Sequence, residues 1–279
     1  MLDFIRVAAA VPDVEVGNAA ENTDRIIEKA AEAENKSPQL TVFPELALTG
    51  YTCADLFFQQ TLLRSAREGL KKIVSCSEAF SSVIAVGLPL EIHGALYNCA
   101  AVIYRGRLYG IVPKTYIPTY NEFYEKRWFT PGARLGSVSL TSAELGIGEL
   151  QTESIPAGRD LIFDTGMFRF GAEICEDLWS VSPPSCDHAV AGATIIVNPS
   201  ASDEVVGKTF YRQQLVSGQS GRLICGYIYA DAGEGESTTD LVFTAHNMIC
   251  ENGTILNQSK FTDELLISEI DVSRLAFER

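Results

Sequence analysis

Residues 168–179, FRFGAEICEDLW, begin as a strand and end on a thiol beside two carboxylates. The first residues alternate between apolar and other side chains, which is the pattern of a β-strand with one buried face. The strand stops at Cys175, and Glu176, Asp177 and Trp179 follow within four positions. A cysteine at a strand end beside acids is well placed to act as a nucleophile at the rim of a sheet. Such a nucleophile needs a base, a group that stabilises an oxyanion, and a substrate pocket.

The composition is that of an acidic globular protein with a sizeable apolar core. Of the 279 residues, 46% are hydrophobic, and the formal net charge is −14. A strongly negative chain repels nucleic acid and anionic membranes, so neither is expected as a partner. No apolar run approaches the roughly 20 residues that a membrane-spanning helix needs. We therefore expect a cytoplasmic protein.

The cysteines and histidines give no sign of a disulfide scaffold or a metal site. The seven cysteines form an odd set and contain no CxxC pair. Cys99 and Cys225 lie within apolar stretches and are expected in the core, whereas Cys175 has polar and aromatic neighbours. The three histidines, at positions 93, 188 and 246, show no metal-ligand spacing. A pairing of Cys175 with one of these histidines stays open as an alternative.

Strands and helices alternate along the chain, which predicts one α/β domain with helices packed on its sheet. Asn18 and Glu21 resemble a capping box, and Asn252-Gly253 is typical of a tight hairpin turn. Residues 114–132 are expected to form a long loop with one helical turn, and 133–160 to be surface elaboration. The expected strands are 4–11, 40–43, 83–88, 97–104, 107–112, 168–175, 194–198, 225–231, 247–250, 254–256 and 265–272, and the expected helices are 19–34, 61–76, a short one after Pro183-Pro184, and 208–221.

Two charged residues follow expected strands directly. Glu45 comes after 40–43 and a proline, and Lys114 comes after 107–112 and another proline. Each could be an ordinary solvated surface charge. In their apolar surroundings, however, Glu45 suits a partly buried general base and Lys114 a cation that neutralises an oxyanion. Because strand ends can meet at one rim of a sheet, these two residues and Cys175 predict an amide-cleaving site.

Three short motifs resemble those of the nitrilase superfamily of carbon–nitrogen hydrolases. They are Phe43-Pro44-Glu45-Leu46, Val112-Pro113-Lys114 and Ile174-Cys175-Glu176. The segments 46–51 (LALTGY), 121–129 (NEFYEKRWF) and 233–240 (GEGESTTD) further resemble the glutaminase domains of glutamine-dependent NAD synthetases. The resemblance covers nearly the whole chain, and it implies a single-domain αββα sandwich.

The resemblance also implies a role for each motif. Glu45 would be the general base and Cys175 the nucleophile, while Lys114 and the backbone N–H of Glu176 would hold the oxyanion. The side-chain amide of glutamine would be attacked to give a γ-glutamyl thioester and ammonia. Water activated by Glu45 would then release glutamate.

Family placement puts further residues around the substrate. The residues implied as substrate contacts are Tyr120, Trp179, Ser202 and Lys208. Lys208 would pair with the carboxylate of the amino acid, and Glu176 or another acid with its ammonium. The alternatives are that Lys208 only leads into the following helix and that Trp179 only packs.

Three other acidic features have their own interpretations. Glu125 matches the family's second glutamate, which positions the lysine; the alternative is a surface ion pair with Lys126 or Arg127. The run Gly-Glu-Gly-Glu at 233–236 lacks the lysine of a P-loop, and its acids would repel phosphate. The resemblance instead suggests a loop near the active site or a subunit contact. Asp177 has no assigned role.

The family resemblance finally implies a partner for the reaction. The family's enzymes carry a C-terminal domain that adenylates the nicotinate dinucleotide with ATP and magnesium and accepts the ammonia. No stretch here resembles its Ser-Gly-Gly loop, so residues 1–279 are expected to be the glutaminase domain alone, with no cofactor or metal of its own. The expected partners are glutamine, a synthetase domain or chain, and further copies of this chain. The alternatives are a free-standing amidase or N-carbamoyl hydrolase, and a non-catalytic docking module.

Overall fold

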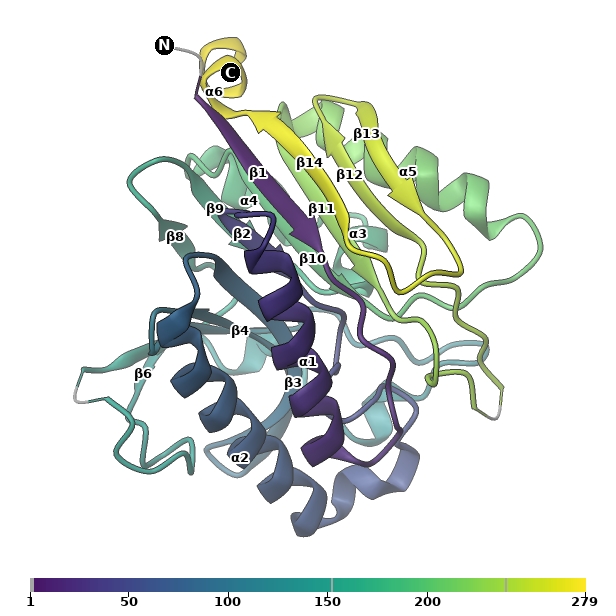
Figure 1. Cartoon of the computed structure of the whole chain (residues 1–279). Helices are drawn as coiled ribbons and strands as arrows, with labels where there is room; N and C mark the ends of the chain where they lie inside the picture. The colour runs from purple at the N-terminus through teal and green to yellow at the C-terminus, as the bar shows by residue number, and fades with distance from the viewer. Residues whose placement is uncertain (1–2, 152, 239) are drawn as a thin grey trace.

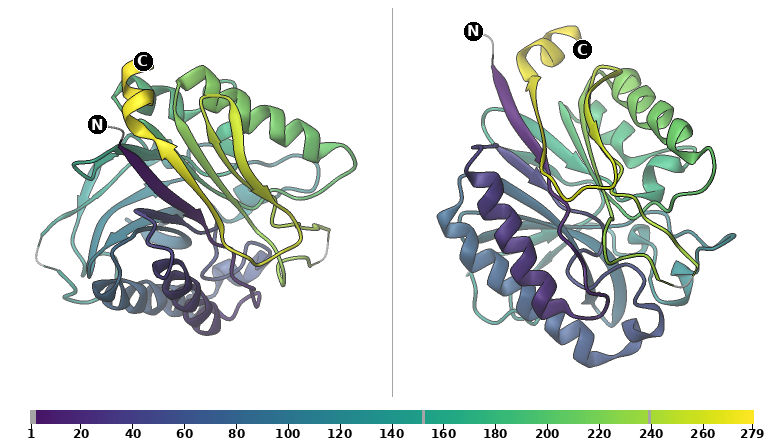
Figure 2. Two further views of the ribbon diagram at one scale, coloured as in Figure 1. Left: turned by 45° about the horizontal axis from the view of Figure 1, so that its top comes forward. Right: turned by 45° about the vertical axis from the view of Figure 1, so that its right-hand side comes forward.

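Two β-sheets lie face to face, and helices cover their outer sides (Figure 1, Figure 2). The computed structural model describes residues 3–151, 153–238 and 240–279, so Thr239 of the 233–240 motif lies outside the described residues. α1 (Ala19–Glu34) and α2 (Gln60–Cys76) pack side by side over the first sheet. α4 (Pro184–Val190) and α5 (Lys208–Leu223) cover the second sheet. The predicted αββα sandwich is confirmed.

The strands of the two sheets come from different parts of the chain. The first sheet consists of β1 (Phe4–Ala9), β2 (Leu40–Val42), β3 (Val83–Ile92), β4 (Ala95–Tyr104), β5 (Arg107–Pro113), β6 (Val138–Leu140), β7 (Ile155–Ala157) and β14 (Leu266–Asp271). The second consists of β8 (Ile162–Asp164), β9 (Arg169–Ala172), β10 (Ile195–Ser200), β11 (Gly226–Asp231), β12 (Asn247–Glu251) and β13 (Thr254–Ser259). Their orders are β14-β1-β2-β3-β4-β5-β7-β6 and β13-β12-β11-β10-β9-β8. Two short helices, α3 (Glu176–Trp179) and α6 (Val272–Glu278), and four 3₁₀ helices complete the described elements; the 3₁₀ helices are η1 (Ala54–Phe58), η2 (Ser77–Ala79), η3 (Glu125–Arg127) and η4 (Gly132–Arg134).

The core follows from the apolar faces of these elements. Between the sheets, inward side chains of β1, β2, β9, β10 and β11 pack together, among them Val7, Val42, Phe170, Val197 and Ile228. A second apolar layer joins α1 and α2 to the first sheet, and a third joins α5 to the second. Burial on both sides explains why the strand sequences 83–88 and 226–231 are almost continuously apolar.

The topology places the ends of several strands close together. β2 runs parallel to β1 and β3, and β10 runs parallel to β9 and β11. β5 runs in the direction of β3, because β4 is antiparallel to both. The two sheets meet where β2 and β10 end, since the N–H of Glu45 donates to the carbonyl of Ser200 at 3.3 Å. The residues that follow these strands therefore converge at one end of the sandwich.

Most predicted elements are confirmed within a few residues, and the prediction for 133–160 is wrong. The helix over 19–34 is found with the bounds expected, and Asn18 accepts from the N–H of Glu21. The return bond of a capping box is not made, because the N–H of Asn18 donates to the carbonyl of Glu15 and Glu21 pairs with Arg25. Asn252 and Gly253 have φ of 43° and 87°, as a type I′ turn demands. The segment 133–160, however, supplies β6 and β7 of the first sheet and buried core residues. Its strands have only three residues each, too short for a periodic pattern.

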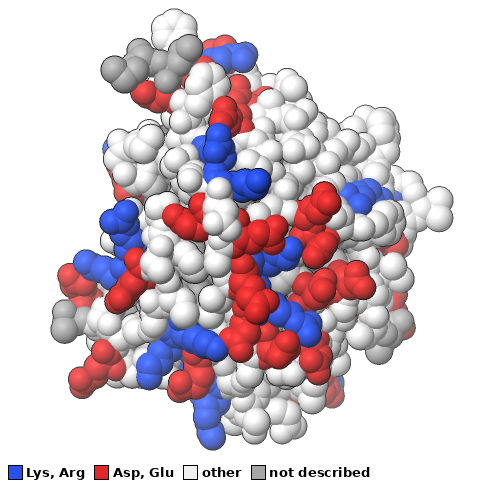
Figure 3. All heavy atoms as spheres, in the orientation of Figure 1, with Lys and Arg blue, Asp and Glu red and all other residues white. Residues whose placement is uncertain are grey.

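The surface agrees with the acidic composition. On the face shown in Figure 3, acidic side chains gather around the middle, with basic ones between them. Ion pairs such as Lys29–Asp263 and Arg25–Glu21 lie on the surface of α1. In the described part of the chain, no helix is both long and apolar enough to cross a membrane.

Candidate active site

The structure brings Glu45, Lys114 and Cys175 together at the end of the sandwich. Glu45 follows β2, Lys114 follows β5, and Cys175 follows β9. The Nζ atom of Lys114 lies 2.6 Å from Oε1 of Glu45, and both side chains are 0% exposed. The charges of these two residues both act on the thiol of Cys175. A carboxylate, a cation and a thiol thus share one buried site.

Glu45 is held by groups from both sheets. Its Oε1 accepts from Nδ2 of Asn98 at 2.6 Å, and its Oε2 accepts from the N–H of Ala201 at 2.9 Å. The loop that carries it lies against β3, where a Cβ on Gly87 would come 2.4 Å from the carbonyl oxygen of Pro44. Only glycine permits this approach. The sequence prediction missed Asn98, since it lies inside a strand 53 positions away.

Cys175 has a backbone conformation that few residues adopt. Its φ is 44° and its ψ is −100°, which is strained for any residue with a side chain. The backbone N–H is held by the side chain of Asn198 at 2.9 Å and by the carbonyl of Pro199 at 3.1 Å. The thiol is buried, and burial together with the charge of Glu45 raises its pKa well above the usual value, although Lys114 opposes this. The thiol is therefore protonated at rest and needs a base.

Glu125 lies in the core beside the lysine. Its Oε1 is 2.6 Å from Nζ of Lys114 and accepts from the hydroxyl of Tyr51 at 2.8 Å. Burial raises the pKa of Glu125 to about 7 against the effect of Lys114. Arg127 pairs instead with Asp55 on the surface, so the alternative of a surface ion pair for Glu125 is wrong. One lysine is thus shared by two buried carboxylates.

A cavity of about 480 Å³ opens in front of Cys175. Glu125 and Glu176 line it, and so do all the residues implied as substrate contacts, which are Tyr120, Trp179, Ser202 and Lys208. The hydroxyl of Tyr120 donates to Oε2 of Glu176 at 2.9 Å. Within the described part of the chain, Oε2 of Glu125 has no hydrogen-bond partner. The cavity therefore offers acceptors at its base and at its wall.

Lys208 is the cation of this cavity. Its Nζ lies over the rings of Trp179 at 5.3 Å and Phe123 at 5.5 Å, and it pairs with Asp203. Lys208 is also the first residue of α5, so it both begins the helix and faces the cavity. Phe123 is an aromatic wall that the sequence prediction did not name.

The loop at 233–236 lies close to the site. Glu236 is buried, and its Oε1 accepts from the N–H of Thr52 at 2.8 Å. Thr52 follows Tyr51, whose hydroxyl bonds Glu125. A Cβ on Gly235 would come 1.7 Å from the carbonyl oxygen of Val14, so a glycine is needed there. This position fits the expected loop near the active site.

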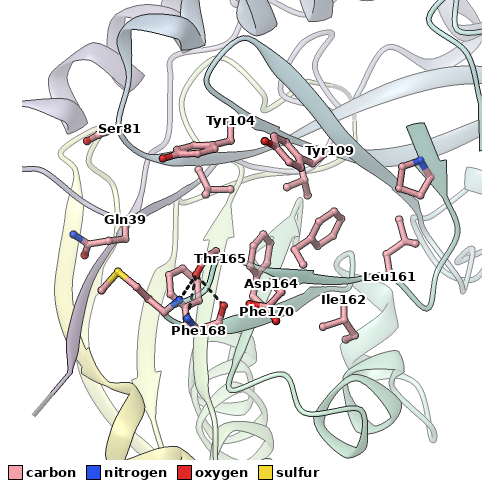
Figure 4. Close-up of a pocket in the computed structure, with 15 residues that line it drawn as sticks. Gln39, Ser81, Tyr104, Tyr109, Leu161, Ile162, Asp164, Thr165, Phe168 and Phe170 are labelled. Atoms are coloured by element: carbon pink, nitrogen blue, oxygen red, sulfur yellow. Dashed lines mark hydrogen bonds between the residues drawn. The ribbon is translucent and has the colours of Figure 1, made fainter. Parts of the chain in front are cut away.

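A second cavity, of about 510 Å³, opens at the other end of the sandwich. Figure 4 shows Tyr104 at the end of β4 and Tyr109 in β5 on one side of it, and Phe168 and Phe170 on the other. None of the candidate catalytic residues lines it. No histidine lines the cavity at Cys175, and the described residues contain no cluster that could hold a metal ion.

Comparisons with known proteins point to one family. A family model described as carbon-nitrogen hydrolase matches residues 6–277. A glutamine-dependent NAD(+) synthetase from Mycobacterium tuberculosis (strain CDC 1551 / Oshkosh) is 38% identical, over 99% of this chain and 40% of that protein. Another, from Thermotoga maritima, is 28% identical, over 96% of this chain and 42% of that protein. This chain thus spans about 40% of the length of these curated relatives.

Solved structures share the fold. A glutamine-dependent NAD(+) synthetase from Cytophaga hutchinsonii matches with a TM-score of 0.82 and 28% identity, over 96% of this chain and 43% of that one. An amidase from Nesterenkonia sp. matches with a TM-score of 0.75 and 19% identity, over 97% of this chain and 92% of that one. The family model covers the chain from residue 6 to 277, and the two facing sheets bring a cysteine, a lysine and two glutamates together at one end. The chain therefore belongs to the carbon–nitrogen hydrolases of the nitrilase superfamily.

Proposed function

We propose that this chain hydrolyses the side-chain amide of glutamine to glutamate and ammonia. The observation that carries the proposal is the position of Lys114 between Glu45 and Glu125, behind a cavity that holds Cys175 and Lys208. The relatives named glutamine-dependent NAD(+) synthetase support glutamine as the substrate.

The first half of the reaction forms a thioester. Glu45 takes the proton of the Cys175 thiol, and the sulfur attacks the amide carbon. The resulting oxyanion is held by the ammonium of Lys114 and the backbone N–H of Glu176. Glu45 then gives its proton to the amide nitrogen, the C–N bond breaks, and ammonia leaves.

The second half returns the thiol. Glu45 takes a proton from water as the water oxygen attacks the thioester carbon, and the same two groups hold the oxyanion. The C–S bond then breaks, the sulfur regains a proton from Glu45, and glutamate leaves. No metal or cofactor takes part in this proposed sequence.

Lys114 is suited to stabilise both oxyanions because its amine stays protonated. Burial alone would lower its pKa, but the neighbouring carboxylates of Glu125 and Glu45 raise the pKa well above the usual value. An ammonium that stays charged in a dry site stabilises a developing negative charge strongly. Oε2 of Glu125, which has no partner among the residues that the structure describes, is available to accept from the amide NH₂ of the substrate.

The cavity carries opposite charges for the two ends of an amino acid. Lys208, which pairs with Asp203 in the free protein, binds the α-carboxylate of the substrate. Glu176, which accepts from Tyr120, binds the α-ammonium. Trp179 and Phe123 enclose the aliphatic chain. Ser202 adds polar groups at the wall of the cavity.

We further propose a use for the ammonia. The relatives are named NAD(+) synthetases, and this chain spans less than half of their length. We expect a synthetase domain or chain that uses ATP and magnesium to consume the ammonia in amidating the nicotinate adenine dinucleotide to NAD. A homo-oligomer of this chain stays a prediction, as does the cytoplasmic location.

Glutamine should be hydrolysed with a higher kcat/KM than 4-aminobutyramide, which lacks only the α-carboxylate. The loss of a hydrogen-bonded charge pair predicts a difference of about 10- to 100-fold. In the variant Lys208→Met this preference should disappear, because no cation then faces the carboxylate. The measurement is ammonia release with each amide as the only substrate.

Lys260→Met is the matched control. This substitution removes the same charge close to α5, where Nζ of Lys260 donates to Thr209. Lys260 does not line the cavity. The preference for glutamine should survive in this variant. A parent enzyme that favours 4-aminobutyramide or an N-carbamoyl compound would instead indicate a general amidase or N-carbamoyl hydrolase, the alternative reading of the same triad.

A further inference from the structure

Asp177 is a buried carboxylate that the reaction above does not use. It lies two positions after Cys175 and is 1% exposed. It does not line the cavity at Cys175. Among the described residues it has no ion-pair partner within 4.0 Å. An acid kept in the core without a cation needs another reason to be there.

Its hydrogen bonds connect two segments of the site. Oδ2 of Asp177 accepts from the backbone N–H of Ile174 at 2.9 Å and of Thr115 at 3.3 Å. Oδ1 accepts from the backbone N–H of Tyr116 at 2.8 Å. Ile174 immediately precedes Cys175, and Thr115 immediately follows Lys114. We call this carboxylate with its three N–H groups the Asp177 clasp.

We propose that Asp177 is a positioning residue that fixes the sulfur of Cys175 relative to the ammonium of Lys114. The proposal rests on the glutamine hydrolysis proposed above. Asp177 touches neither substrate nor reacting atoms; it acts through the backbone on both sides of the site.

The two segments need such a connection because they belong to different sheets. β5, which leads to Lys114, lies in the first sheet, and β9, which leads to Cys175, lies in the second. The backbone N–H of Lys114 is bound to its own sheet, through the carbonyl of Asn98 at 2.8 Å. The next two N–H groups turn to Asp177. Since a misplacement of about 1 Å can cost about 10²-fold in rate, this link between sheets matters for catalysis.

The clasp requires a carboxylate and not an amide. All three partners of Asp177 are backbone N–H groups, which can only donate. An asparagine has one acceptor oxygen, and its NH₂ would face at least one of these donors. In Asp177→Asn at least one N–H therefore loses its acceptor and the two segments move apart.

Asp271 offers a matched control at the other end of the sandwich, where it pairs with Phe4 at the start of β1. It is also a buried acid, and its Oδ1 accepts from the backbone N–H of Arg274 at 2.9 Å at the start of α6. An asparagine keeps one acceptor oxygen, and it caps a helix about as well as an aspartate. The same chemical change therefore leaves this site satisfied.

The test compares kcat and KM for glutamine in the parent chain, Asp177→Asn and Asp271→Asn. We expect kcat to fall about 10²-fold in Asp177→Asn, while KM changes less than about 3-fold. We expect Asp271→Asn to stay within about 3-fold of the parent in both values. A kcat of Asp177→Asn close to that of the parent, or an equal fall in Asp271→Asn, would overturn the proposal. A parent without glutaminase activity would overturn the proposed function instead.

A second measurement needs no variant and decides the case in which Asp177→Asn does not fold or the parent is inactive. Amide hydrogen exchange of the parent should show the N–H groups of Thr115 and Tyr116 strongly protected, although they lie outside helices and strands. Exchange at the rate of an open loop would mean that the clasp does not hold, and the proposal would fail.

Discussion

Cys175→Ala is expected to reduce kcat for glutamine hydrolysis by about 10⁴-fold or more. Without the sulfur no thioester forms, and the remaining groups can only assist a direct attack by water. The variant should keep its fold, because the side chain loses one buried atom and leaves only a small cavity. Release of ammonia under saturating glutamine measures the effect.

Cys250→Ala is the control for this variant. Cys250 is a fully buried thiol in β12, and burial raises its pKa to about 12. Its loss removes the same atom from the core at a position far from the candidate site in the sheet. We expect kcat in Cys250→Ala to stay close to that of the parent. A parental rate in Cys175→Ala would contradict the role of Cys175 as the nucleophile. A folded parent that hydrolyses no amide would instead indicate a docking module whose triad is vestigial.

Lys114→Met is expected to damage both activity and stability. The ammonium lies 2.6 Å from a carboxylate oxygen of Glu45 and 2.6 Å from one of Glu125. Its removal leaves two acidic side chains buried without their cation, and the loss of one partner of a buried ion pair typically costs about 3–5 kcal/mol of unfolding free energy. Loss of the oxyanion partner should lower kcat by about 10²- to 10³-fold in whatever protein remains folded.

Urea unfolding and ammonia release measure these two effects separately. The double variant Lys114→Met/Glu125→Gln replaces one of the two unpaired acids by a neutral amide, so it should recover part of the lost stability. It should recover none of the activity, because the oxyanion partner is still missing. A single variant as stable as the parent would contradict the role of Lys114 as the shared partner of two buried acidic side chains.

The parts of the fold that the sequence predicted are those whose causes are local. The helix over 19–34 has an amphipathic face and a capping residue within its own segment. The hairpin turn at Asn252-Gly253 depends on two adjacent residues. The placement of Glu45, Lys114 and Cys175 after strands could likewise be read from the apolar run before each of them.

The features that escaped prediction depend on distant contacts. β7 in the segment 133–160 becomes a strand because Ala157 pairs with Ile111 in β5, 46 positions earlier. Asn98 and Tyr51 act on the site through partners 53 and 74 positions away. Asp177 bonds N–H groups 61 and 62 positions earlier. A local pattern contains no signal for any of these contacts.

The most direct test of the account is to treat the intact chain with an electrophilic analogue of glutamine and to locate the adduct by peptide mass spectrometry. Burial protects Cys53, Cys99, Cys225 and Cys250, whereas Cys175 lies at a cavity with a base beside it. We expect an adduct on Cys175 that excess glutamine suppresses, and any adduct on the half-buried Cys76 or Cys186 should not respond to glutamine. An unmodified Cys175 in folded protein, or a Cys175 adduct that glutamine does not suppress, would contradict the proposed mechanism.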